Sequence, residues 1–118
     1  MGFFDKFKKK SPTSGFDFAN VDSNEKALAL VQKGELVPVY LMSPRFGGVE
    51  DVRNVVYAPA IVAELKDKCD DTIEDLLRNG KVKSYSATPQ YKGNSFIPSS
   101  ILITASGESS FSETINIW

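Results

Sequence analysis

Apolar residues recur at spacings of three and four in two stretches of the chain, which is the pattern of an amphipathic helix. The first stretch covers residues 23–33 and is followed by Gly34, a typical helix stop. The second begins after Pro59, a residue favoured in the first turn of a helix, and runs to Arg78. Its apolar stripe consists of Val62, Leu65, Cys69, Ile73 and Leu76. The sequence therefore predicts two helices, each with one buried face.

Five other stretches are rich in β-branched, aromatic and other apolar residues, as strands are. They cover residues 36–42, 54–57, 81–88, 100–106 and 110–118. No helical pattern separates the last three, so we expect an antiparallel meander with a turn at Gly107 and Glu108. The order helix, strand, strand, helix and three strands is typical of an α+β fold. We expect a mostly antiparallel sheet of four or five strands, with both helices packed on one face.

Residues 1–20 differ in composition from the rest. The chain begins MGFFDKFKKK, and a polar, Ser- and Pro-containing stretch follows. We expect a flexible basic and aromatic tail and linker over residues 1–20, and a single α+β domain over residues 21–118. If the first ten residues are helical, three phenylalanines share one face and could contact a membrane surface: Phe3, Phe4 and Phe7. The alternative is a solvated tail whose phenylalanines pack on the domain.

The most restrictive feature of the composition is the absence of histidine from the 118 residues, together with a single cysteine, Cys69. Histidine is the usual general base near neutral pH and the commonest metal ligand. Without it the chain builds no Ser-His-Asp triad, no Cys-His pair and no ordinary zinc site. Cys69 lies on the apolar stripe, where we expect it to pack rather than react. The composition therefore favours binding over catalysis, and we expect no metal and no cofactor.

The charge balance and the lone cysteine narrow the partners and the compartment. A formal net charge of -1 argues against general nucleic-acid binding, which needs a surplus of lysine and arginine. One cysteine cannot form an internal disulfide, so the reducing cytoplasm is the simplest location. No apolar run approaches the roughly 20 residues that cross a bilayer.

The second helix carries many more acidic than basic residues. Its candidate partner-binding residues are Asp67, Asp71, Glu74 and Asp75. A surface of this kind can meet a basic protein, because complementary charge speeds the encounter. The alternative is a solvated outer face, which is the usual role of such a run of charge.

Two long connections add further candidates. Residues 43–53 (SPRFGGVEDVR) contain Arg45 and Phe46 and match no phosphate-binding glycine motif. Residues 89–98 (PQYKGNSFIP) contain Tyr91, Lys92, Asn94 and Phe96. Long loops with aromatic and amide side chains are typical of binding surfaces. The alternative for the second loop is that its aromatic residues fold back over the edge of the sheet.

These features lead to a first hypothesis of a small cytoplasmic, non-enzymatic module that binds and occludes a protein partner, as an immunity protein or antitoxin does. A second hypothesis is a small-ligand-binding protein or an enzyme based on lysine or a desolvated carboxylate, for which Glu50, Asp51 and Glu113 are candidates. A third is a peripheral membrane adaptor that uses the N-terminal segment. The chain could also form a homodimer through its C-terminal strand, with Trp118 in the interface.

Overall fold

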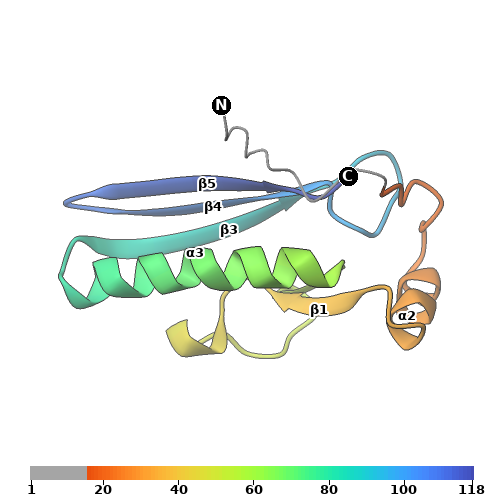
Figure 1. The fold of residues 1–118 in the computed structure, drawn as a ribbon, viewed down its shortest axis with the longest axis horizontal. Helices are drawn as coiled ribbons and strands as arrows, with labels where there is room; N and C mark the ends of the chain where they lie inside the picture. Colours follow the sequence, from red (N-terminus) through yellow and green to blue (C-terminus); the bar gives the residue numbers. More distant parts are fainter. Residues whose placement is uncertain (1–15) are drawn as a thin grey trace.

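The computed structural model describes residues 16–118 of this chain (Figure 1). The helices are α2 (Asn24–Gln32) and α3 (Ala60–Arg78), with a short 3-10 helix η1 (Pro44–Phe46) between them. The strands are β1 (Val37–Tyr40), β2 (Val55–Ala58), β3 (Val82–Gln90), β4 (Ser100–Gly107) and β5 (Ser110–Asn116). Both predicted helices and all five predicted strands are therefore present, with ends close to those expected. The predictions for Phe3, Phe4 and Phe7 lie outside the described residues.

The five strands form two antiparallel sheets rather than one. β1 pairs with β2, and the larger sheet has the order β3-β4-β5. The expectation of a single four- or five-stranded sheet is therefore wrong, although the α+β class and the antiparallel meander are confirmed. Only Pro59 separates β2 from α3, so the small sheet stays beside this helix. It lies on the opposite side of α3 from the large sheet (Figure 1).

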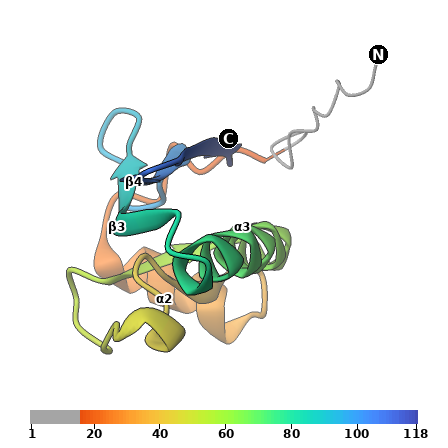
Figure 2. The same ribbon diagram turned by 90° about the vertical axis from the view of Figure 1, so that its left-hand side faces the viewer.

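α3 lies along one face of the large sheet (Figure 2), and a single hydrophobic core includes residues of α3 and of both sheets. Alternate residues of β4 point into it, and Ile101 and Ile103 are fully buried there. On α3, Val62 and Ile73 are also fully buried, and the other three members of the predicted stripe are partly buried against the core. The stripe read from the sequence is therefore confirmed, because a period near 3.6 marks a helix face that packs on one layer.

The first helix, α2, lies at one end of the molecule, so only α3 covers the face of the large sheet (Figure 1). Ser23 caps α2 by accepting a hydrogen bond from the Lys26 backbone N–H at 3.2 Å. Gly34 follows the helix with φ +81°, which is the left-handed conformation expected of a helix stop. A buried Ala27 joins α2 to the core. The expectation that both helices pack on one face of the sheet is therefore wrong, because α2 buries only Ala27 whereas α3 has a long buried stripe.

The packed structure includes residues before position 21. Phe18 is 8% exposed and belongs to the core. Its ring stacks on Phe16 at 5.7 Å between centroids and meets Trp118 edge-on at 6.2 Å. The Trp118 indole N–H donates to the Ile97 carbonyl at 3.1 Å. Both ends of the described chain are thus tied together by aromatic packing.

Residues 43–54 form a loop that is fixed by one asparagine. The Asn54 side chain accepts from the Met42 N–H at 2.8 Å and donates to the carbonyls of Met42 and Val49 at 3.0 and 2.9 Å. Gly48 lies so close to this point that any Cβ would overlap the Met42 carbonyl oxygen. Asn54 therefore fastens both sides of the loop to each other.

None of the helices in residues 16–118 is long and apolar enough to cross a membrane.

Two adjacent glycines provide a test of this loop. Gly48→Ala should lower the free energy of unfolding by about 3 kcal/mol or more, because the added methyl group meets fixed backbone. Gly47→Ala should cost only about 1–2 kcal/mol, since φ at Gly47 is +93° but the space around it is open. Urea unfolding measures both values. Equal losses for the two variants would contradict the close contact at Gly48.

Candidate functional site

The acidic surface of α3 is organised around one arginine from η1. We call Asp67, Asp71, Glu74 and Asp75 the acidic cluster. Arg45 donates to Asp67 at 2.6 Å, to Asp71 at 2.7 Å and to Glu74 at 3.0 Å. This ring of carboxylates raises the pKa of the Arg45 guanidinium, with the Asp71 hydrogen bond as the largest cause. The cluster is therefore partly neutralised from within the chain.

The acidic cluster still carries an excess of negative charge. Arg78 adds contacts to Glu74 at 3.3 Å and to Asp75 at 3.4 Å. Four carboxylates then face two guanidiniums, so two negative charges remain. The side chains of Asp67 and Asp71 are 67% and 64% exposed, and their outer oxygens are open to solvent or to a partner. Such exposed ion pairs contribute little to stability, on the order of 0–1 kcal/mol each.

A second group of charges lies beneath this surface and is almost completely buried. Lys66 and Asp70 are each 3% exposed, and the Lys66 ammonium donates to both Asp70 oxygens at 2.8 and 3.1 Å. The Lys66 nitrogen also lies 5.4 Å from the centre of the Tyr85 ring. The Tyr85 hydroxyl has two acceptors for its one hydrogen, the Leu41 carbonyl at 2.8 Å and Asp70 at 3.1 Å. Among residues 16–118 no buried side-chain polar atom lacks a partner.

Burial raises the pKa of the Tyr85 hydroxyl well above its usual value near 10, and the negative charge of Asp70 adds to the effect. The phenol therefore stays neutral and serves as a hydrogen-bond donor. It joins β3, which carries Tyr85, to α3 and to the end of β1. Phe46 of η1 packs on the same ring at 5.2 Å between centroids.

A shallow pocket of about 150 Å³ opens between α3 and the small sheet. Lys66, Asp67 and Asp70 lie along its α3 side, and Pro38, Val39 and Tyr40 line it from β1. Its charged groups are paired with one another or with Arg45.

Among the carboxylates proposed for catalysis, Asp51 has a lowered pKa because the Arg53 backbone N–H donates to it. A lowered pKa is the opposite of what a general base needs near neutral pH.

At one end of the molecule lie aromatic residues from the 16–18 stretch, from the 89–98 loop and from the C-terminal position 118. We define this aromatic end as Phe16, Phe18, Tyr91, Phe96 and Trp118. The loop is fastened to the N-terminal stretch, since the Phe96 N–H donates to the Val21 carbonyl at 2.7 Å and Ser95 donates to the Phe18 carbonyl at 2.8 Å. Tyr91 and Phe96 are 48% and 49% exposed. The loop therefore presents these two rings from a fixed backbone.

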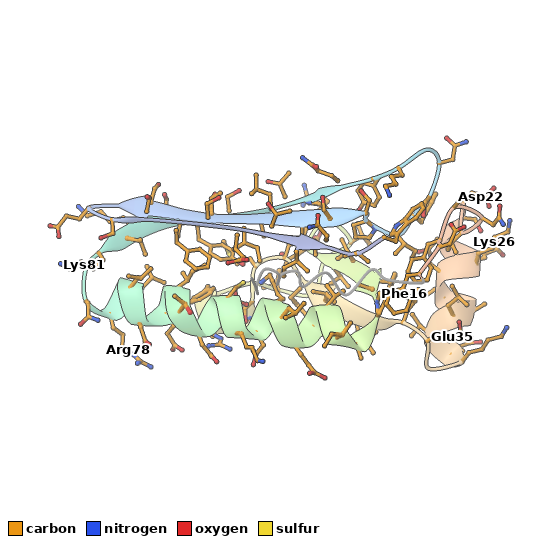
Figure 3. All side chains as sticks on the ribbon, turned by 45° about the horizontal axis from the view of Figure 1, so that its top comes forward. Phe16, Asp22, Lys26, Glu35, Arg78 and Lys81 are labelled. Carbon is orange, nitrogen blue, oxygen red and sulfur yellow. The ribbon has the colours of Figure 1, made fainter. Side chains whose placement is uncertain are left out.

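The aromatic end carries one close positive charge. The Lys92 ammonium lies 5.0 Å from the centre of the Trp118 ring, within the range of a cation–π contact. Asn94 is exposed at the tip of the same loop. Figure 3 shows Phe16 at this end of the molecule and Arg78 at the other. The aromatic end and the C-terminal part of the acidic cluster thus lie far apart along the molecule.

Several predicted site residues meet in the structure, and others do not. Arg45, predicted as part of a loop surface, bonds to Asp67, Asp71 and Glu74, which were predicted as part of the helix surface. Tyr91, Lys92, Asn94 and Phe96 form a separate group at the aromatic end. The sequence pattern did not predict the buried group formed by Lys66, Asp70 and Tyr85. Lys66 and Asp70 are spaced as i and i+4 between buried positions, which was the available signal, but their charge suggested a solvated face.

Comparisons with protein-family models, with curated proteins and with solved structures found no match for this chain.

The buried pair supports a test of its energetics. Asp70→Asn should lower the free energy of unfolding by about 3 kcal/mol or more, because it leaves the Lys66 charge enclosed without its counterion. The double variant Lys66→Met/Asp70→Leu should lie within about 1 kcal/mol of the wild type, since apolar replacements of similar volume remove both charges. Asp75→Asn, at an exposed position, serves as the control. Equal destabilisation in the single and double variants would contradict this account of the pair.

The single thiol supports a test by pH. Burial raises the pKa of Cys69 to about 11, with the negative charges of Glu113 and Asp70 adding to the effect. Since the thiolate is the reactive form, alkylation by iodoacetamide in the folded protein should rise about tenfold per pH unit through pH 10. In urea the rate should level off above the ordinary thiol pKa of 9.0. A native profile that levels off near pH 9 would contradict the effect of burial on the thiol.

Proposed function

We propose that this protein is a small, non-enzymatic module that binds another protein and occludes it in a stoichiometric complex, in the manner of an immunity protein or an antitoxin. The aromatic end provides the main contact, and the acidic cluster favours a partner with a basic surface. The module acts in the cytoplasm, where its one thiol stays reduced. It needs no cofactor for this role.

The observation that carries the proposal is the fixed presentation of Tyr91 and Phe96. Both aromatic rings are half exposed to water in the free protein. A partner that covers them gains the favourable free energy of burying their apolar surface. Their loop is already held by the hydrogen bonds of Ser95 and Phe96, so little conformational entropy is lost on binding. Aromatic anchors of this kind dominate the affinity of protein interfaces.

The pocket beside α3 supports the small-ligand alternative much less well. Its volume of about 150 Å³ is below the roughly 300–1,000 Å³ typical of ligand sites. Lys66 and Asp70 satisfy each other there, and a ligand would have to break a buried pair to reach either one. Protein binding through an exposed surface requires no such rearrangement.

The acidic cluster has a separate part in the proposal. Its excess negative charge attracts a basic surface over the distance of a Debye length and so raises the association rate. Arg45 holds three of its carboxylates in place, so their free oxygens are directed before the partner arrives. Removal of charge here should slow association, whereas loss of the aromatic rings should speed dissociation.

The test is capture of partners from source-cell lysate with the tagged full chain, followed by binding measurements on the purified partner. Tyr91→Ser/Phe96→Ser should weaken binding at least about 30-fold, the size expected for the loss of interface anchors. Val49→Ser/Val52→Ser is the matched control, because these residues are also apolar and are 67% and 91% exposed. It should bind as the wild type does.

An Asp67→Asn/Asp75→Asn variant completes the design. It should lower the association rate at low salt and leave the dissociation rate unchanged, because exposed charges act mainly on the encounter. Absence of any stoichiometric partner would overturn the proposed function. Equal loss of affinity in the aromatic variant and its control would remove the aromatic end from it.

A further inference from the structure

We propose that the open edge of β5 is a pairing site for a second copy of this chain, so that two copies form one continuous six-stranded antiparallel sheet around a two-fold axis. β5 pairs with β4 along all seven of its residues, without a register shift. Within residues 16–118 no strand pairs with the edge of β5 that faces away from β4. The two ends of the large sheet are therefore β3 and β5. This inference is independent of the proposed binding function.

The backbone groups that face the open edge can be identified from the ladder. The Ile117 N–H donates to the Ser99 carbonyl at 2.7 Å, and the Gly107 N–H donates to the Ser109 carbonyl at 2.9 Å. Because antiparallel hydrogen bonding alternates along a strand, the odd-numbered residues of β5 bond to β4. The N–H and carbonyl groups of the even-numbered residues therefore point outward. They belong to Ser110, Ser112, Thr114 and Asn116.

The opposite edge of the sheet is more strongly protected than the β5 edge. β3 contains Pro89 and Lys83, and its register with β4 shifts between Val82 and Ser84. Proline, lysine and bulges are the usual means by which proteins prevent strand addition at an edge. β5, with the sequence SFSETIN, has no proline, lysine or register shift, and its one charge, Glu113, lies on the side of the sheet that faces α3. The β3 edge therefore carries three protecting features and the β5 edge one, so β5 is the less protected edge.

The side chains of β5 fit a second copy of the same strand. In a two-fold antiparallel pair, even-numbered residues lie opposite even-numbered ones, so their outward groups bond to each other reciprocally. All four even-numbered residues are uncharged, and Glu113 is the only charge on the strand. A register centred on Glu113 would place this carboxylate opposite its own copy, which is unfavourable. Registers centred on Ser112 or on Thr114 avoid that repulsion.

The first test is sedimentation equilibrium of the full chain and of Ser112→Lys/Thr114→Lys. The wild type should show twice the mass of one chain. In the variant, one lysine lies opposite its own copy in either allowed register, so the mass should fall to that of one chain. The matched control is Ser86→Lys/Thr88→Lys, which adds the same charge to exposed positions of β3 and should stay dimeric. Far-UV circular dichroism checks that all three are folded.

The second test is backbone hydrogen exchange in the unmodified chain, which does not depend on how a variant folds. The amides of Ser112 and Thr114 should exchange at least about tenfold more slowly at a concentration where the dimer forms than in dilute protein. Those of Glu113 and Ile115, which bond to β4, should be protected in both. A monomer at every concentration would overturn the proposal, as would a dimer whose formation leaves the Ser112 and Thr114 amides unchanged.

Discussion

The packing of α3 on two sides is the constraint on which the rest of this structure depends. The large sheet covers one face of the helix and the small sheet lies against another, so α3 is the middle layer of the molecule (Figures 1 and 2). A helix with one buried face needs only an apolar stripe. A helix enclosed from two directions buries polar positions as well, and on α3 these are Lys66 and Asp70. Their charges are compatible with burial because they neutralise each other and have further polar or aromatic neighbours.

This buried group also joins the layers. Tyr85 extends from β3 to Asp70 on α3 and to the Leu41 carbonyl after β1, so a single side chain contacts all three layers. Phe46 packs on the same ring, and its neighbour Arg45 turns outward to the acidic cluster. The loop that holds these two residues is therefore fixed to α3 from inside and from outside. The acidic surface is a consequence of this arrangement and is more rigid than an isolated run of charge.

The aromatic end and the acidic cluster are surfaces of different chemistry. At the aromatic end, Phe18 is buried and contacts Trp118, whereas Tyr91 and Phe96 remain half exposed. Along α3, the outer carboxylates are held by arginines and stay wet. The third surface, the β5 edge, is formed by backbone rather than side chains. The three surfaces differ in chemistry: the aromatic end offers apolar rings, the acidic cluster offers negative charge, and the β5 edge offers backbone hydrogen-bonding groups. Experiments can therefore test their roles separately.

The sequence by itself determined the local elements. The apolar stripe of α3, the stop at Gly34 and the meander of the last three strands depend on periodicity and turn residues, which are local properties. Only the tertiary structure decided that the strands divide into two sheets, that Lys66 and Asp70 are enclosed, and that Arg45 meets Asp71 from 26 positions earlier. These outcomes depend on which layers pack against α3. A pattern along the chain cannot report that, because it shows which face of a helix is apolar but not how many sides are covered.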